Sequence, residues 1–196
     1  MSSDKKIGDC LVHEMSQRRS FPKLESPAPS EALMNSIFTA ALRAPDHMHL
    51  RPWRFLVISG SDRQFLGDLF AKDCLENNPH ANLETIESAR QKASRAPLIV
   101  VGIASYKDHQ RVPKIEQTIA TGCVLSNIGL AVYASGYGSV WRTGPYATSA
   151  TVRQGLGVDS GEDILGYIYI GTPTKVDRPV KVLDKNDFFS QWPAKK

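Results

Sequence analysis

Three short groups of residues combine arginine with other polar or aromatic side chains and are the best suited in this chain to bind a ligand. They are Arg18-Arg19-Ser20, the segment 43–53, and Trp141-Arg142-Thr143. Each is predicted to lie where a helix or strand ends, so that free backbone N–H groups and long side chains can converge on an anion. Because the planar guanidinium group binds phosphate through two hydrogen bonds at once, the three groups together indicate a site for a phosphate-bearing cofactor.

Each group also has a purely structural explanation. Arg18 and Arg19 could cap the C-terminus of a helix, Arg43 could offset the dipole of another helix end, and Arg142 could be an ordinary residue at the end of a strand. Taken singly, these explanations are the simpler ones. A common site is favoured only when the groups are taken together, because proline and tryptophan restrict the conformation of two of them.

Familiar catalytic motifs are absent from the sequence. It contains no P-loop, no HExxH zinc motif and no GxSxG nucleophile elbow. The run 136–141 begins like a dinucleotide-binding turn, but it ends in Trp141 and is predicted to follow a helix. His47 and His49 lack a third clustered ligand, so we expect polar loop residues and no metal site. Without a nucleophile or general base, we expect a bound cofactor to carry the chemistry and no side chain to be catalytic.

Two residues of the long helix predicted over 113–135 receive structural interpretations. Cys123 is most simply a small buried hydrophobic residue. Glu116 is most simply an acid of the first turn that complements the helix dipole. The three cysteines are odd in number and widely spaced, which disfavours disulfides and a zinc site and is typical of a reducing compartment.

The composition is typical of a soluble globular protein of one domain. The 196 residues are 41% apolar and 22% charged, enough to form one hydrophobic core. The net charge is +4 without a dense run of lysine and arginine, so we expect no nucleic-acid partner. The apolar stretch 119–134 is interrupted by Ser126 and Asn127, and no signal peptide is apparent. We therefore expect a cytoplasmic protein with no membrane association.

The hydrophobic pattern predicts helices that alternate with short buried strands. Helices are expected over 5–17, 31–42 with Ser30 as N-cap, 62–77, 84–94, 113–135 and 149–156. Strands are expected over 55–59, 98–104, 139–141 and 165–170, and the segment 21–29 is expected to be an extended loop. This order predicts an α+β domain with a mixed sheet.

Two features raise the question of a second chain. The helix over 113–135 is rich in small residues that would let another helix or a sheet approach closely, and a central core helix is favoured over a dedicated binding helix. The tail carries Phe188, Phe189 and Trp192 among polar residues. Packing on a neighbouring subunit and wrapping around the same chain are both open for this tail.

The order and spacing of these residues resemble the nitroreductase flavoprotein family. Arg18-Arg19-Ser20, the segment 43–53, Trp141-Arg142-Thr143 and Gly171-Thr172-Pro173 occur in the same order there, most closely in its short bacterial branch of NAD(P)H nitroreductases. The resemblance implies one α+β domain over 1–196, with a mixed β-sheet surrounded by helices. It also implies a homodimer with FMN at the subunit interface, the long helix in that interface and the tail 174–196 packed on the partner.

The resemblance also implies roles for individual residues. Arg18, Arg19 and Ser20 would hold FMN, and Trp141, Arg142 and Thr143 would contact the flavin of the same subunit. Arg43 and His47 would come from the other subunit. A contact with NAD(P)H is implied over Ala131, Val132, Tyr133, Ala134, Ser135 and Gly136.

The implied activity is that of an FMN-dependent NAD(P)H oxidoreductase. Hydride would pass from NAD(P)H through FMN to a nitroaromatic, a quinone or a similar small acceptor. A flavin-consuming relative, a dehalogenating relative and a non-catalytic flavin-binding protein are the alternatives. Asp46, His49 and Arg51 stand where many members have serine and amide side chains. His49 and Arg51 add positive charge at positions where amides are usual, which leaves the choice of acceptor open.

Overall fold

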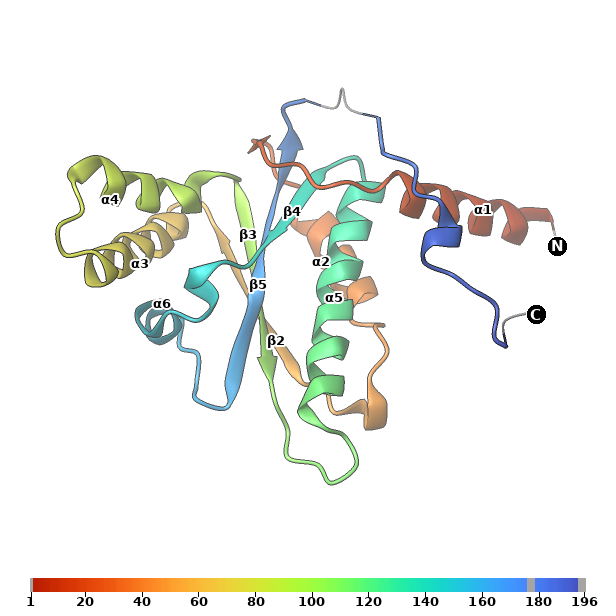
Figure 1. Ribbon diagram of the computed structural model, residues 1–196. Coiled ribbons are helices and arrows are strands. Elements are labelled where there is room, and N and C mark those ends of the chain that lie inside the picture. The colour runs from red at the N-terminus through yellow and green to blue at the C-terminus, as the bar shows by residue number, and fades with distance from the viewer. Residues whose placement is uncertain (1, 176–178, 194–196) are drawn as a thin grey trace.

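The computed structural model describes residues 2–175 and 179–193, and the chain alternates between helices and strands along most of this length (Figure 1). The helices are α1 (Ser2–Gln17), α2 (Glu31–Ala41), α3 (Asp62–Asn77), α4 (Leu83–Arg90), α5 (Lys114–Ala134) and α6 (Ala150–Gly155). The strands are β1 (Leu24–Glu25), β2 (Trp53–Ser59), β3 (Leu98–Ser105), β4 (Gly138–Arg142) and β5 (Glu162–Pro173). Short 3-10 turns include η1 (His47–His49) and η3 (Pro145–Ala147).

The sheet is organised around β5, which pairs with three other strands. The strand order is β1-β5-β3-β2, and β4 also pairs with β5. The pairing of β5 with β3 places Ile168 opposite Val100, and its pairing with β4 places Ile168 opposite Trp141. Every strand pair within the described ranges is antiparallel. β5 runs opposite to β1, β3 and β4, and β3 runs opposite to β2.

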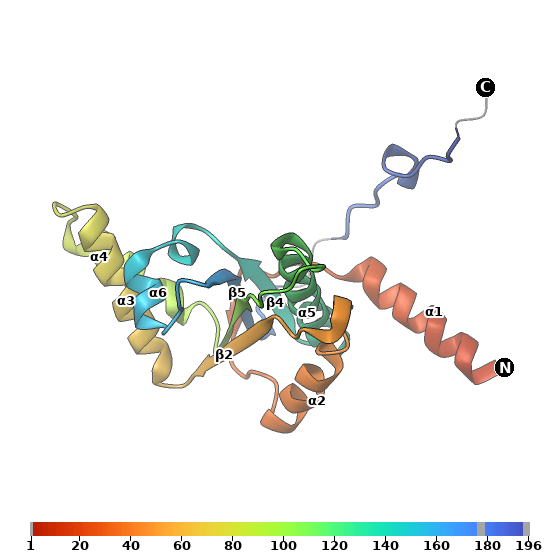
Figure 2. The ribbon, with the colours of Figure 1, turned by 90° about the horizontal axis from the view of Figure 1, so that it is seen from below.

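Helices cover both faces of this sheet. In Figures 1 and 2, α5 and α2 lie on one side, and α3, α4 and α6 lie on the other. Successive strand residues point to opposite faces, so Val100 and Ile168 pack with α5, whereas Val101 and Tyr167 pack with α3. All four side chains are buried. The α+β class predicted from the sequence is thereby confirmed.

The close approach of α5 to the sheet depends on a small residue of β3. A Cβ atom at Gly102 would lie 2.5 Å from the Cδ2 atom of Leu125, which is fully buried and therefore has little room to move. α5 is the helix of the described ranges that is long and apolar enough to cross a membrane. Its buried residues face the sheet and α2, which makes it the core helix of the domain.

Most element boundaries agree with the predictions, and the differences in the strands arise from pairing with distant segments. Ser30 caps α2 as predicted, because its Oγ accepts a hydrogen bond from the N–H of Leu33 at 3.3 Å. The helix predicted over 84–94 ends at Arg90 and continues as a 3-10 turn. The strand predicted over 165–170 is longer, because its ends also pair with β3 and β1. The predicted loop 21–29 contains β1, which pairs with the end of β5.

Both terminal segments extend away from this body. In Figures 1 and 2, α1 and the C-terminal segment project on the side of α5. The apolar stripe of α1 is exposed: Ile7, Leu11, Val12 and Met15. The aromatic residues of the tail are exposed as well, with Trp192 at 94%. Residues 179–193 therefore do not wrap around their own chain, which was one of the two arrangements left open for this tail.

Candidate functional site

A cavity of about 300 Å³ brings together parts of two predicted groups. It lies between the second half of α5, the strand β4 and the residues that follow α1. Its lining consists of Arg18, Ser20, Leu125, Ser126, Gly129, Ser139, Trp141 and Ile168. Segments more than 100 residues apart in the sequence thus meet at one cavity.

The segment after α1 is held in place through Phe21. The N–H of Phe21 donates to the carbonyl oxygen of Ser139 at 3.0 Å, and its buried ring stacks on Tyr133 of α5 with centroids 6.3 Å apart. Arg18 follows the last turn of α1, where its N–H donates to the carbonyl of Glu14 at 3.0 Å. Residues 18–20 are therefore a short bridge fixed at both ends, which places Arg18 and Ser20 beside β4.

Trp141 is fixed against β5. Its indole Nε1–H donates to the carbonyl oxygen of Leu165 at 3.0 Å. The next residue of β5, Gly166, has a φ of 143°, and a Cβ there would overlap the indole nitrogen. Because no side chain intervenes, the indole can lie directly on β5 while it lines the cavity.

Arg142 lies on the other face of the sheet. Its Cζ is 6.0 Å from the ring centroid of Tyr169, and its Nε is buried without a hydrogen-bond partner in the part of the chain that the structure describes. Burial raises the pKa of the Tyr169 hydroxyl to about 12, although Arg95 and Arg142 oppose this shift. Thr143 follows β4 and is exposed. The group 141–143 is therefore split, with Trp141 in the cavity and the Arg142 side chain outside it.

Arg43 and His47 do not line this cavity in the same chain. Arg43 follows α2 and is exposed. His47 lies in η1, where its Nδ1 is 2.8 Å from Oε2 of Glu116 in the first turn of α5. Glu116 and Gly129 are separated by about 20 Å along the helix at 1.5 Å per residue. One chain alone therefore keeps His47 apart from Arg18.

The segment around His47 has an unusual backbone. Met48, His49 and Arg51 have φ angles of 60°, 52° and 48°, in the left-handed region that side chains with a Cβ rarely adopt. The carboxylate of Asp46 accepts the N–H of Arg51 at 2.7 Å and closes the turn. Such strain is often found at functional sites. Asp46 thus stabilises a loop that presents His49 and Arg51 to solvent.

The stretch proposed for NAD(P)H differs in accessibility along its length. Val132 is fully buried, Tyr133 is partly covered by Phe21, and the end of the stretch at 134–136 is exposed. Ser135 turns its hydroxyl back to the carbonyl of Ala131 at 2.8 Å. The end of the stretch, from Ala134 to Gly136, therefore offers a surface to a ligand.

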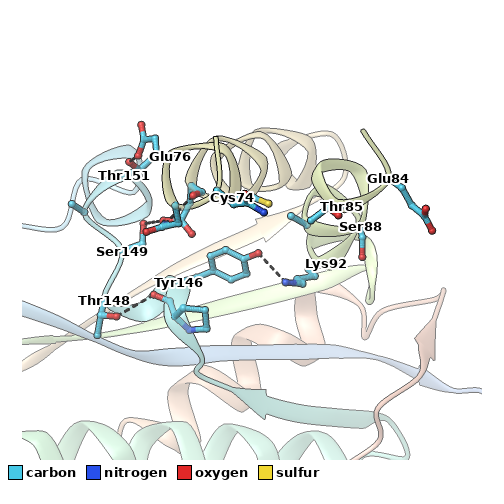
Figure 3. A pocket seen from close by; sticks show the side chains of 16 residues that line it. Cys74, Glu76, Glu84, Thr85, Ser88, Lys92, Tyr146, Thr148, Ser149 and Thr151 are labelled. Carbon is cyan, nitrogen blue, oxygen red and sulfur yellow. Dashed lines mark hydrogen bonds between the residues drawn. The ribbon is translucent and has the colours of Figure 1, made fainter. Parts of the chain in front are cut away.

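A larger cavity, of about 940 Å³, lies on the opposite face of the sheet between the α3–α4 pair and the segment from η3 to α6 (Figure 3). Its lining includes three carboxylates, those of Asp73, Glu76 and Glu84, against one ammonium group, that of Lys92. Lys92 Nζ donates to the hydroxyl of Tyr146 at 2.9 Å. No residue predicted for cofactor binding lines this cavity, and its net negative charge would repel a phosphate.

The smaller cavity has the opposite chemistry and fits the predicted FMN. It offers the guanidinium of Arg18 and the hydroxyls of Ser20, Ser126 and Ser139, and no carboxylate lines it. Hydroxyls and a guanidinium donate the hydrogen bonds that phosphate and ribityl oxygens accept. The residues present therefore suit a phosphate-bearing, hydroxylated cofactor.

Several residues at the cavity and beside His47, among them Ser126, Gly129 and Glu116, are not marked as site residues by any sequence signal. Ser126 and Gly129 are two of the small residues of the long helix, and their spacing of three places them on one face of it. Glu116 was interpreted as a dipole-complementing acid. Its partner His47 is 69 positions away, and no sequence signal links the two.

Known proteins resemble this chain over most of its length. The sequence pattern of the Nitroreductase family matches residues 15–172. The chain is 33% identical over 176 residues to "Putative NAD(P)H nitroreductase YdjA" of Escherichia coli (strain K12), which covers 89% of this chain and 95% of that protein. It is 32% identical over 177 residues to a Haemophilus influenzae protein with the same functional name, with the same two coverages.

Solved structures of the same fold give a consistent result. A nitroreductase-like family protein from Bacillus cereus superimposes with a TM-score of 0.80 at 21% identity, over 94% of this chain and 96% of that one. The FMN and NADPH-dependent nitroreductase NfnB from Sphigopyxis sp. strain HMH gives a TM-score of 0.71 at 17% identity, over 92% and 98%. At these identities the structures establish the fold, and the sequence matches establish the relationship. The chain belongs to the nitroreductase family.

Proposed function

We propose that this protein is an FMN-dependent oxidoreductase that passes a hydride from NAD(P)H to a nitroaromatic, a quinone or a similar conjugated acceptor. The observation that carries the proposal is the cavity where Arg18, Ser20 and Trp141 meet, which is lined by a cation and hydroxyls and by no carboxylate. The names of the relatives support the same reaction class. Localisation in the cytoplasm is part of the proposal.

The residues around the cavity would divide the binding of FMN among them. Arg18 in the lining, and Arg19 next to it in the sequence, would supply positive charge for the phosphate and ribityl oxygens. Ser20, Ser126 and Ser139 would supply hydroxyl donors. Trp141 and Thr143, at the end of β4, would contact the flavin. When bound, FMN supplies the redox chemistry, since it accepts a hydride at N5 and gives it up again.

The side chains assist this chemistry through charge and shape. Cationic donors held near the flavin stabilise the negative charge that reduction brings to its N1–O2 edge. Trp141 is anchored on β5 and gives the site a rigid wall. NAD(P)H and the acceptor would occupy the same place in turn. No side chain has to act as a nucleophile, which agrees with the absence of a nucleophilic motif.

We further propose that the working site needs two copies of the chain. Arg43 and His47 of the partner subunit would complete the cavity, because the same chain holds His47 beside Glu116, well apart from Arg18. A second copy would also cover exposed apolar residues on three elements: Ile7, Leu11, Val12 and Met15 of α1, Ile115 and Ile119 of α5, and Phe188, Phe189 and Trp192 of the tail. Large apolar surface of this kind is typical of an interface between subunits.

The proposal is tested with the purified protein. We expect it to be yellow, or to become so when reconstituted with FMN, and to oxidise NADH or NADPH when a nitroaromatic or quinone is added. Product analysis under nitrogen and under oxygen separates acceptor reduction from consumption of the flavin or dehalogenation. Bound FMN that neither NADH nor NADPH reduces would indicate a flavin-binding protein without turnover. Colourless protein that cannot be reconstituted contradicts the proposal.

A further inference from the structure

The contact between His47 and Glu116 joins two segments that the sequence keeps far apart. Nδ1 of His47 lies 2.8 Å from Oε2 of Glu116, and the side chains are 51% and 45% exposed. A pair with this exposure adds little to stability. It nevertheless fixes the orientation of an imidazole ring, and this is where its importance lies.

The loop that carries His47 is held at both of its ends. On one side, Asp46 binds the N–H of Arg51. On the other, the carbonyl oxygen of Pro52 accepts the hydroxyl of Thr121 at 3.0 Å and the N–H of Ser105 at 2.9 Å. These bonds hold the three left-handed residues of the loop in place. The core of the domain therefore sets the position of the loop. What is left for Glu116 to orient is the imidazole ring of His47.

Glu116 is suited to that task by its place in α5. A carboxylate in the first turn of a helix is stabilised by the free N–H groups and the dipole there. The neighbouring cation, Lys114, is directed elsewhere, with its Nζ 3.8 Å from the carboxylate of Asp163 and 4.3 Å from the ring centroid of Tyr106. The carboxylate of Glu116 is thus available to the imidazole.

We propose that Glu116 is a positioning residue of the flavin site: it holds a proton on Nδ1 of His47 and so turns Nε2 toward FMN bound to the other subunit. A carboxylate accepts but does not donate, so its neighbour Nδ1 must be the nitrogen that carries the proton. In the neutral ring, Nε2 is then an acceptor on the opposite edge. The inference rests on the proposed two-chain FMN site and adds a residue to it.

The simpler explanation is that Glu116 only complements the helix dipole, and two substitutions separate the explanations. Glu116→Asp keeps the charge in the first turn but shortens the side chain by one methylene, so it loses the contact with His47. Glu116→Gln keeps the reach and an accepting oxygen but loses the charge. Positioning predicts that Gln resembles the native residue more closely than Asp, and the dipole explanation predicts the reverse order.

The experiment uses two measurements on the full-length protein. Ring ¹⁵N NMR, with His47→Asn used to assign the signal, reports which nitrogen of His47 carries the proton, both without and with FMN. Flavin fluorescence gives the Kd for FMN. We expect the Nδ1–H form in the native protein and in Glu116→Gln. We expect the Nε2–H form to predominate in Glu116→Asp and Glu116→Ala, with FMN bound about tenfold more weakly, the effect of losing one well-placed hydrogen bond.

A matched control is present in the same chain. Glu84 is an exposed acid in the first turn of α4, away from the small cavity. Glu84→Asp and Glu84→Gln should leave the His47 signal and the Kd unchanged. Thermal unfolding of every variant checks that the fold is intact.

The outcomes separate this inference from the function on which it rests. FMN binding that is normal in the native protein and equally strong in Glu116→Asp overturns the positioning role and leaves the proposed function standing. The same holds if Glu116→Gln is impaired more than Glu116→Asp. A native protein that binds no FMN overturns the proposed function and this inference with it.

Discussion

Trp141 and Arg142 are neighbours in the sequence but lie on opposite faces of the sheet. The indole of Trp141 lines the small cavity beside α5, whereas the guanidinium of Arg142 lies over the ring of Tyr169 on the side of α3. This separation follows from the alternation of side chains along a strand. It divides the three arginine-containing groups into residues that can touch a ligand in the cavity and residues that support its wall.

The first prediction compares Arg18 with Arg142. Arg18→Ala removes the cation that lines the cavity, and loss of a charge-assisted hydrogen bond should weaken FMN binding by about 1.5–3 kcal/mol. Arg142→Ala should weaken FMN binding less and lower the melting temperature more, because its side chain packs on Tyr169. Fluorescence titration and thermal unfolding measure the two effects. Lys72→Ala on α3, an exposed cation far from the cavity, is the control, and equal effects of the two arginine variants on FMN binding would contradict the assignment.

The second prediction concerns a glycine in the wall of the cavity. A Cβ at Gly129 would lie 3.6 Å from Oγ of Ser139, which is ordinary contact, so Gly129→Ala should fold and gain about 0.5–1 kcal/mol from helix propensity. The added methyl group would occupy part of a cavity of about 300 Å³. We therefore expect weaker FMN binding with an unchanged or higher melting temperature. Gly122→Ala in the same helix, outside the lining, is the matched control and should retain FMN.

The third prediction concerns the dependence of stability on pH. The carboxylate of Glu162 accepts hydrogen bonds from Nε and Nη2 of Arg54 at 2.7 and 2.5 Å. The Arg54 guanidinium is the main cause that lowers the pKa of Glu162 from its ordinary 4.5 to about 2, against the opposing effect of burial. Because the folded-state pKa is depressed, the resulting stability is complete above about pH 5 and is lost as the pH falls through 2. Its size is about 3 kcal/mol at neutral pH.

Glu162→Gln tests this dependence. Urea unfolding should show the native protein to be more stable by about 3 kcal/mol at pH 7, and this difference should shrink steadily below pH 4. Glu76→Gln, which changes a half-exposed carboxylate, should leave the pH profile unchanged. A difference between Glu162→Gln and the native protein that persists at pH 2 would mean that the side chain acts through packing instead of charge.

The fourth prediction tests whether one site is built from two chains. Arg18→Ala and His47→Ala should each impair FMN-dependent activity. When the two variants are mixed and allowed to exchange subunits, half of the dimers are mixed, and each mixed dimer holds one intact site and one doubly altered site. About a quarter of the native number of sites should then return. If each site belonged to a single chain, mixing would restore nothing.

Much of the fold could be predicted from the sequence because its signals are local. Ser30 marks the start of α2, and the apolar run 98–104 predicts the buried strand β3. The limits of β5 were less predictable, since its length is set by pairing with β1, β3 and β4. Local patterns therefore predict that an element exists, and its partners decide where it ends.

The candidate site was only partly predictable. Its arginine-containing groups were recognised by residue type and by their order along the chain. The pairing of His47 with Glu116 could not be predicted, because it depends on how η1 is placed against α5. The opposite placement of Trp141 and Arg142 could have been expected from the strand period, but the group 141–143 was treated as one unit.

The exposed apolar stripe of α1 has a consequence for how the protein behaves on dilution. A surface carrying Ile7, Leu11 and Val12 in water favours association by mass action. If cofactor retention needs both chains, subunit exchange and flavin loss become one coupled equilibrium. Melting temperature and bound flavin should then rise together with protein concentration, and added FMN should hold the dimer together at concentrations where the apoprotein dissociates.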